Sequence, residues 1–272
     1  MTGPENAVHV VSSADDPALA PFRQLKDATQ RARGNFIVES ERVLQRMIAL
    51  GATFEAILVT PPRWERIADA VATARGVDGP PLVIVADPDV VDRAVGFALH
   101  RGVVAIARRP SPLDPAAALA STQRVVVLED VVDPDNVGSV FRHAAAFGAG
   151  LVVLSEHAGD PLYRKAVRTS MGWVLDVPWT RVAGVDELVP TLHRAGFTTI
   201  ALTPSGVVAI DDARLPRSAD ERVAVLLGSE HDGLRHATLA ASSHRVRIPI
   251  ARRVDSLNVA TAAAVAMFSL FR

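Results

Sequence analysis

The N-terminal part of the chain alternates between short apolar runs and amphipathic stretches, a pattern typical of an α/β unit. Four apolar runs have the length and composition of buried strands and predict strands at residues 35–39, 56–60, 82–86 and 103–107. Three stretches between them carry apolar side chains at helical spacing and predict helices at residues 41–50, 64–75 and 88–97. We therefore expect a small α/β domain over residues 20–108.

The same alternation continues on a larger scale in the C-terminal part. Mostly apolar runs predict strands at residues 124–128, 151–155, 198–202, 223–227 and 245–250. Helical patterns separate them, at residues 137–147, 163–171, 185–195 and 256–271. Apolar strands separated by helices indicate a parallel sheet that is covered on both faces. We expect a second domain over residues 116–272.

A proline-rich segment at residues 109–115 separates the two patterns. Pro110, Pro112 and Pro115 cannot all lie inside a helix or a central strand, and they favour an extended spacer. We therefore predict a linker there.

Composition narrows the function. The chain has 272 residues, 49% of them apolar, and a net charge of −1, so nucleic acid could bind only through a local basic patch. It has no cysteine, which excludes disulfides and thiolate-bound zinc, and we assign no metal site. No segment predicts a signal peptide or a membrane span, so we expect a cytoplasmic protein without a membrane partner.

A polar turn and a helix follow the predicted strand at 124–128. Val137, Phe141 and Ala144 lie on one apolar face of that helix, and Arg142 lies off it. Asn136 and Arg142 can therefore converge on one crevice at the carboxyl end of the strand. A turn asparagine and a solvated helix arginine would give the same pattern.

Two glycines flank a carboxylate after the predicted strand at 223–227. Gly228 and Gly233 would let the backbone approach a ligand closely, with Glu230 between them. An ordinary glycine turn is the alternative interpretation.

A third polar segment joins the last predicted strand to an alanine-rich helix. Asp255 or Ser256 can cap this helix, which would put Ser256 and Asn258 beside its unpaired N–H groups. A strand end beside a helix N-terminus is a common ligand site in α/β folds, although capping residues alone are routine.

Together these segments resemble the motifs of the SpoU (TrmH) family of RNA ribose 2′-O-methyltransferases. Residues 136–148 match Asn-x-Gly-x-x-x-Arg-x-Ala-x-x-Phe-Gly, and residues 228–234 match Gly-Ser-Glu-x-x-Gly-Leu. Residues 248–259 match Ile-Pro-Met…Val-Asp-Ser-Leu-Asn-Val, with Ile250 in place of Met. Residues 165–172 look like the connecting segment of the family, and residues 34–42 resemble the start of the small L30e-like RNA-binding domain of many members.

The resemblance implies a SPOUT-type α/β fold, with a parallel sheet and a C-terminal trefoil knot, preceded by an L30e-like domain. It implies S-adenosylmethionine as the methyl donor, RNA as the substrate and a homodimer formed through the knotted domain. By the same resemblance Arg142 has the central catalytic role, and Asn136, Glu230, Ser256 and Asn258 orient it and the ribose. The cofactor would lie near Thr203, Gly228, Ile248 and Leu257.

Two positions depart from the family pattern. His231 and Arg252 stand where the family usually has glycine, and both put bulk or charge at the rim of the expected site. They could narrow the cofactor entrance or add phosphate contacts.

The first domain is expected to supply affinity for RNA. Its basic residues are candidates for phosphate contact, namely Arg23, Lys26, Arg31, Arg33 and Arg42. A solvated helix face explains them as well.

The extra L30e-like domain favours ribosomal RNA over transfer RNA, and we name 23S rRNA as the expected target. Transfer RNA methylation, and a non-catalytic RNA-binding or assembly factor with the same fold, remain as alternatives. A small-molecule O-methyltransferase is disfavoured by the basic first domain.

Overall fold

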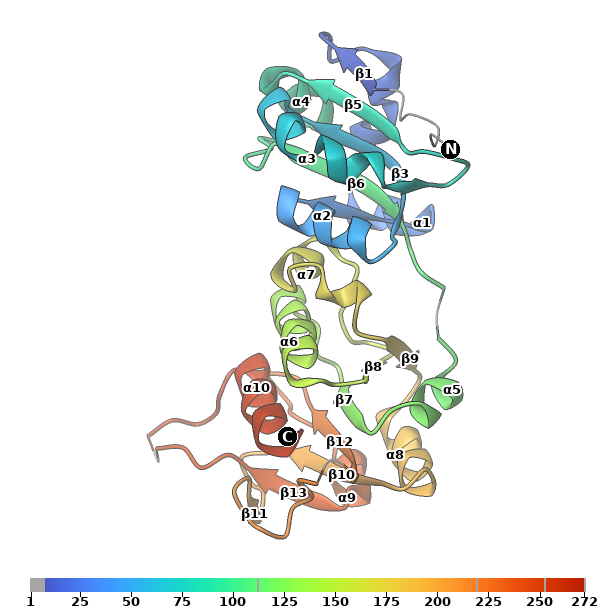
Figure 1. Ribbon diagram of the computed structural model, residues 1–272. Helices are drawn as coiled ribbons and strands as arrows, with labels where there is room; N and C mark the ends of the chain where they lie inside the picture. The colour runs from blue at the N-terminus through green and yellow to red at the C-terminus, as the bar shows by residue number, and fades with distance from the viewer. Residues whose placement is uncertain (1–7, 112, 219, 252, 272) are drawn as a thin grey trace. The chain divides into compact units, whose positions relative to one another are not determined.

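The computed structural model describes residues 8–111, 113–218, 220–251 and 253–271 (Figure 1). The chain forms two compact units. Unit 1 consists of Met1–Pro110 and Leu162–Leu175, and unit 2 consists of Ser111–Pro161 and Asp176–Arg272. In the part of the chain that the structure describes, no helix is long and apolar enough to cross a membrane.

Unit 1 is built on a mixed sheet with the strand order β1-β5-β3-β6-β2, and β4 pairs with β3. Its strands are β1 Val8–Val11, β2 Asn35–Glu39, β3 Thr53–Val59, β4 Arg75–Gly76, β5 Leu82–Ala86 and β6 Val103–Arg108. Strand β6 runs antiparallel to both β3 and β2, whereas β1, β5 and β3 are mutually parallel. Because β1 pairs with β5, the sheet of unit 1 includes residues before residue 20.

Short helices cover the sheet of unit 1. They are η1 Pro17–Gln24, α1 Asp27–Ala32, α2 Glu41–Ala49, α3 Pro61–Ala72 and α4 Pro88–Val95. Phe22 of η1 and Val91 of α4 are fully buried against strand side chains such as Ile84 and Leu58. Helices α2 and α3 pack against each other and bury their own apolar stripe, including Leu44 and Ile67.

The segment at residues 162–175 packs within unit 1, although we assigned it to the second domain. It contains α7 Arg164–Thr169 and η2 Trp173–Leu175. Arg164 forms an ion pair with Glu39 at 3.2 Å, and the backbone N–H of Arg164 donates to Asp27 at 2.7 Å. Arg46 donates to the carbonyl of Met171 at 2.9 Å and lies over the Trp173 ring at 3.9 Å from its centroid. Polar contacts of this kind leave little trace in a hydrophobic pattern.

Unit 2 is built on a parallel sheet, as predicted, and its strand order is β11-β13-β10-β12-β7-β8-β9. Its strands are β7 Arg124–Leu128, β8 Leu151–Ser155, β9 Trp179–Val182, β10 Phe197–Leu202, β11 Val208–Ala209, β12 Arg222–Leu227 and β13 His244–Arg247. The predicted strand at 245–250 ends at Arg247 instead, because Pro249 has no N–H to donate to a ladder.

Helices cover both faces of this sheet. They are α5 Pro115–Ala120, α6 Pro134–Phe147, α8 Val185–Arg194, α9 His236–Ala241 and α10 Val259–Leu270. Val189 and Leu192 of α8 are buried against strand side chains such as Val153 and Leu226. Helices α6 and α10 pack side by side (Figure 1). Phe147 of α6 and Phe268 of α10 are in edge-to-face contact.

Candidate functional site

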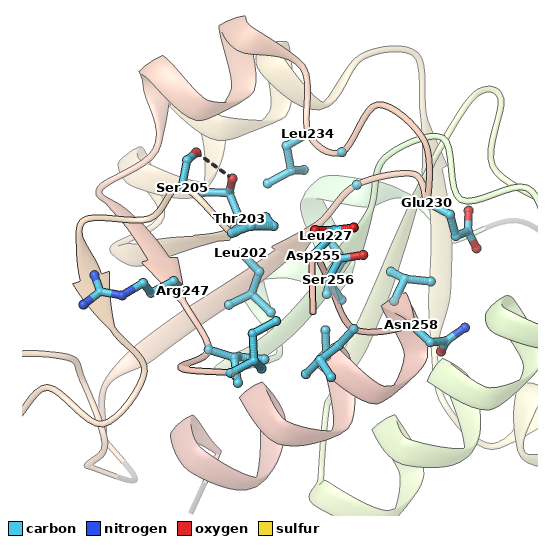
Figure 2. A pocket seen from close by; sticks show the side chains of 18 of the residues that line it. Leu202, Thr203, Ser205, Leu227, Glu230, Leu234, Arg247, Asp255, Ser256 and Asn258 are labelled. Atoms are coloured by element: carbon cyan, nitrogen blue, oxygen red, sulfur yellow. Dashed lines mark hydrogen bonds between the residues drawn. The ribbon is translucent and has the colours of Figure 1, made fainter. Parts of the chain in front are cut away.

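The main pocket of unit 2 lies where β10, β12 and β13 end, as expected for a parallel α/β sheet. It has a volume of about 850 Å³. Three loops form its walls: the residues after β10, the loop at 228–234 after β12 and the long segment at 248–258 before α10. Figure 2 shows Thr203 and Ser205 on one side of the pocket and Glu230 and Asn258 on the other.

Each predicted cofactor residue lines this pocket, namely Thr203, Gly228, Ile248 and Leu257. The N–H of Thr203 donates to the carbonyl of Val246 at 2.9 Å, so the loop after β10 is fixed to β13. The Thr203 and Ser205 hydroxyls lie 3.1 Å apart in a hydrogen bond (Figure 2). The pocket therefore brings together residues that the sequence separates by more than fifty positions.

Gly228 is required by the backbone itself. A Cβ atom at this position would lie 2.0 Å from the carbonyl carbon of Gly233, where no side chain fits. Gly233 has φ of +67°, and its N–H donates to the carbonyl of Ser229 at 3.1 Å, which closes the loop on itself. The loop thus offers backbone groups to the pocket without intervening side chains.

Glu129 binds the residues that follow this loop, a role that was not predicted from the sequence. Its side chain is 1% exposed and accepts hydrogen bonds from the N–H of Arg235 at 2.9 Å and the hydroxyl of Thr238 at 2.7 Å. Its own N–H donates to the carbonyl of Leu227 at 2.8 Å. A glutamate directly after an apolar strand was the available signal, since a buried carboxylate needs such partners.

Asp130 adds a second anchor beside it. Its carboxylate pairs with Arg235 at 2.7 Å and accepts a hydrogen bond from Ser155 at 2.8 Å. Burial raises the pKa of this carboxyl, but the bonds from Ser155 and Arg235 outweigh it, and the pKa lies below its usual value. Asp130 is therefore ionised at neutral pH and links the end of β7 to Ser155 and Arg235. Its φ of +55° lies in the left-handed region, at the turn after β7.

Three polar side chains from three separate segments meet at the rim of the pocket. The side-chain N–H of Asn136 donates to the Glu230 carboxylate. The side-chain oxygen of Asn136 accepts a hydrogen bond from the Asn258 amide at 2.8 Å. Asn258 and Glu230 line the pocket itself, and Asn136 reaches them from α6. This chain of hydrogen bonds joins one residue from each segment that resembles a family motif.

The starts of α6 and α10 differ from their predictions. Helix α10 begins at Val259 with Asn258 as its N-cap, whose side chain accepts from the N–H groups of Ala260 and Thr261. The predicted caps Asp255 and Ser256 are therefore wrong, and both residues instead line the pocket in the loop before the helix (Figure 2). Helix α6 begins at Pro134, three residues before its predicted start, because Asp133 caps it. Asn136 thus lies in the first helical turn.

Arg142 lies apart from the pocket. It is exposed on α6, and within the described residues it makes no hydrogen bond or ion pair. It does not belong to the residues that line the pocket, so the structure brings together Asn136, Glu230 and Asn258 but leaves Arg142 on the open surface of the helix. A cation in this position is available to a large ligand.

Among the described residues that line the pocket, carboxylates outnumber free cations. Glu230, Asp232 and Asp255 line it and are exposed. Arg247 also lines it, but its guanidinium donates to the carbonyls of Gly206 and Val207 at 2.9 and 3.0 Å. The arrangement favours a ligand that carries positive charge.

Of the two departures from the family pattern, His231 lines the pocket and is exposed. Arg252 lies outside the described residues. The described residues Ala251 and Val254 line the pocket.

The predicted RNA-binding residues are all exposed on unit 1, namely Arg23, Lys26, Arg31, Arg33 and Arg42. Arg23 and Arg33 make local hydrogen bonds. Arg23 donates to the carbonyls of Ala14 and Asp16, and Arg33 donates to the side chain of Gln24 at 2.6 Å.

Comparison with known proteins gives a consistent result. Residues 123–268 match the SpoU rRNA Methylase family. An uncharacterised tRNA/rRNA methyltransferase of Mycobacterium bovis is 41% identical over 270 residues, which cover 97% of this chain and 92% of that protein. The 23S rRNA (guanosine-2′-O-)-methyltransferase RlmB of Vibrio vulnificus is 27% identical over 186 residues, covering 66% of this chain and 73% of that protein.

Solved structures extend the similarity to both units. The AdoMet-bound rRNA methyltransferase of Sinorhizobium meliloti superposes with a TM-score of 0.78 at 26% identity. The match covers 97% of each chain.

Proposed function

The chain belongs to the SpoU rRNA Methylase family, and on that premise we propose that it methylates a ribose 2′-hydroxyl of 23S ribosomal RNA. Its class is that of an S-adenosylmethionine-dependent RNA 2′-O-methyltransferase. The observation that carries the proposal is the hydrogen-bonded chain of Asn136, Glu230 and Asn258 at the pocket rim. Ribosomal RNA as the substrate rests on the RlmB relative, whose name specifies 23S rRNA.

The pocket suits S-adenosylmethionine in size, shape and charge. Its volume of about 850 Å³ is in the range of small-molecule sites. The loop at Gly228 presents backbone hydrogen-bonding groups, and apolar side chains such as Leu202 and Leu227 line the interior. Glu230, Asp232 and Asp255 complement a sulfonium cation. When bound, this cofactor supplies an activated methyl group.

Arg142 is proposed as the group that acts on the ribose. A ribose hydroxyl is a weak acid, so transfer needs stabilisation of its developing negative charge. An arginine is a poor proton acceptor because its pKa is far above neutrality. We assign Arg142 an electrostatic role, in which the exposed guanidinium lowers the pKa of the hydroxyl and an RNA phosphate takes the proton.

Asn136, Glu230, Ser256 and Asn258 would orient the ribose. Glu230 holds the Asn136 amide, and Asn136 in turn holds Asn258, whose oxygen caps α10. Each amide is thereby fixed in one orientation. Ser256 lines the pocket next to them and is available to a substrate hydroxyl.

Three further features belong to the same proposal. The loops at 228–234 and 248–258 would form the trefoil knot, and two subunits would associate through unit 2 into a homodimer. Unit 1 would be an L30e-like domain that binds RNA through its exposed basic residues. Because the substrate is ribosomal RNA, we place the reaction in the cytoplasm.

Two alternatives differ in what they bind. A tRNA methyltransferase would share the cofactor site, since the Mycobacterium bovis relative is named for both RNA classes. A non-catalytic assembly factor would not need the cofactor, and the intact pocket argues against it.

Methyl transfer to separate RNA pools distinguishes these functions. Purified protein with labelled S-adenosylmethionine should label 23S rRNA from a strain that lacks the gene, and leave 16S rRNA and tRNA unlabelled. Label in tRNA alone would establish the first alternative. No label in any pool, together with no cofactor binding by calorimetry, would establish the second.

A further inference from the structure

One edge of the sheet in unit 1 gathers the starts of two helices. Strands β2 and β3 end there, and β6, which runs antiparallel to both, begins there. The N–H of Ser40 donates to the carbonyl of Val103 at 3.4 Å, and the N–H of Thr60 donates to that of Gly102 at 3.0 Å. Helices α2 and α3 follow directly after Ser40 and Thr60. The positive ends of two helix dipoles therefore lie at this edge.

Neither helix neutralises its own N-terminus with a side-chain cap. Ser40 and Thr60 occupy the N-cap positions, yet neither hydroxyl accepts a bond from the first turn. Ser40 also has a φ of +82°, a strained conformation for a residue with a side chain. Glu41 lies in the first turn of α2, and Pro61 and Pro62 leave α3 without N–H groups at its first two positions, so an anion at this edge must be bound mainly by side chains.

Two adjoining hollows open at this edge, each of about 440 Å³. Arg63, Arg66 and His100 line both of them. Arg42 and Arg101 line one, together with Ser40. Gly102, with φ of +64°, brings the turn of Arg101 against α3, because a Cβ there would lie 3.1 Å from Cγ of Arg63. Four guanidinium groups from three segments thus share one small surface.

The acidic side chains nearby do not cancel this charge. Glu41 pairs with Arg63 at 3.3 Å and with Arg66 at 3.1 Å, so a single carboxylate fixes two guanidiniums in place. Asp92 lines the other hollow, and its carboxylate accepts a bond from the N–H of Leu99 at 2.7 Å. Arg42 and Arg101 are exposed and form no hydrogen bond or ion pair within the described residues.

We infer that this surface, which we call the arginine hollow and define by Arg42, Arg63, Arg66 and Arg101, binds consecutive phosphates of an RNA backbone. The two adjoining cavities and the shared arginines fit a chain of phosphodiesters better than a single anion. Arg63 and Arg66 are held in place for bidentate contact, and Arg42 and Arg101 supply unpaired charge. The inference rests on the proposed function only in taking RNA as the ligand.

The arginine hollow changes which cations of unit 1 bind RNA. Among the residues expected from the sequence, Arg42 lines it, whereas Arg23 and Arg33 make local bonds elsewhere. Arg63, Arg66 and Arg101 were not among the candidates. The salt dependence of RNA binding by the full chain therefore depends on Arg42 and Arg101 more than on Arg23 and Arg33.

The experiment compares double variants of the full chain. Binding of a fluorescein-labelled hairpin RNA is measured by anisotropy over a range of salt concentrations. R42Q/R101Q should weaken binding at low salt by at least about tenfold and reduce the slope of log affinity against log salt by about two. R42K/R101K keeps the charge and should keep the slope. Arg75→Gln removes an exposed arginine of unit 1 outside the hollow and should change the slope little.

A slope for R42Q/R101Q equal to that of the wild type, with the fold intact by thermal melting, would overturn the inference. A loss of the same size in R23Q/R33Q would also overturn it. Competition by inorganic phosphate alone, with no slope change in the RNA titration, would show a site for a free anion instead. The result is independent of methyl transfer, because the hairpin assay needs neither cofactor nor turnover.

Discussion

The pocket of unit 2 and the arginine hollow of unit 1 are built in opposite ways. The shape of the pocket is set by the backbone of its loops. Gly228 lies so close to the backbone of Gly233 that no side chain would fit there. Asn258 caps α10, the helix that follows the last of these loops. The hollow is formed by long side chains, with Arg63 and Arg66 of α3 paired to Glu41 of α2. A small ligand of fixed shape requires specific backbone conformations, whereas a polyanion requires only charge at roughly the right spacing.

This difference sets how each region responds to mutation. A single change in the pocket or at its rim alters a fixed geometry and should have a large effect. A single change in the hollow removes one of several similar charges and should have a small one. The following variants test that contrast in order of expected effect.

Arg142→Ala should have the largest effect. Arg142 is the one exposed cation that we place at the reacting ribose, and loss of one such oriented group costs on the order of a hundredfold in rate. Arg42→Gln, in the hollow, should reduce the rate only a few-fold, at low RNA concentration. Both variants should fold and bind S-adenosylmethionine as the wild type does, by melting and calorimetry. Equal losses in the two variants would remove the contrast.

Gly228→Ala should rank second. The added methyl group would collide with the backbone of Gly233 and displace the loop, so S-adenosylmethionine affinity should fall by at least about tenfold. Gly184→Ala is the matched control in unit 2, because the atom nearest to its Cβ would be the Asp186 carboxylate at 2.8 Å, the end of a side chain that can move, and not backbone. Calorimetric titration measures both. Unchanged cofactor affinity in Gly228→Ala would mean that the loop does not hold the cofactor.

Asn258 separates the cap of α10 from the hydrogen bond at the rim. Asn258→Ala removes both, and loss of the cap should cost about 1 kcal/mol, or a few degrees in Tm. Asn258→Asp retains an oxygen acceptor for the cap but removes the donor to Asn136. Its Tm should stay close to that of the wild type while its rate falls. A rate loss in the Ala variant alone would assign Asn258 a purely structural role.

His143→Gln should have the smallest effect, on the pH dependence of thermal stability. His143 lies on α6, and its buried Nδ1 atom has no hydrogen-bond partner among the described residues. Burial lowers the pKa of this imidazole below its ordinary value. The unfolded chain therefore binds a proton more readily than the folded one, so this residue contributes less stability as the pH falls through about 6.5. Melting curves at pH 8 and pH 5.5 measure the loss of Tm on acidification. His143→Gln should show a smaller loss of Tm on acidification than the wild type, and an equal loss would contradict the assignment.

The difference between the pocket and the hollow also explains which parts of the structure could be predicted from the sequence. Continuous apolar runs such as Leu151–Ser155 identify their strands to the residue, since a strand buried on both faces needs apolar side chains throughout. The pocket loops were predictable because their glycines and capping residues lie close together in the chain. The start of α10 was not, because Asp255, Ser256 and Asn258 are all good caps and only the packed structure selects one.

The arginine hollow was beyond local patterns for another reason. Arg42, Arg63 and Arg101 are far apart in sequence, and they converge only because β6 pairs antiparallel with β2 and β3. Helix α5 was missed because Pro110, Pro112 and Pro115 favour a spacer, although Pro115 is well placed in the first turn of a helix. The information for the hollow lies in the tertiary pairing, whereas the signals for α5, Pro115 and the Asp114 cap, are local.

The central claim is that the chain transfers a methyl group to a ribose hydroxyl of RNA, and the position of the label tests it most directly. Ribosomal RNA is incubated with the protein and S-adenosylmethionine labelled in its methyl group, and is then hydrolysed with alkali. Alkaline cleavage needs a free 2′-hydroxyl, so a methylated ribose leaves an uncleaved dinucleotide. We predict that the label appears in such dinucleotides with the wild type and is absent with Arg142→Ala. Label recovered in mononucleotides would mean methylation of a base and would contradict the claim.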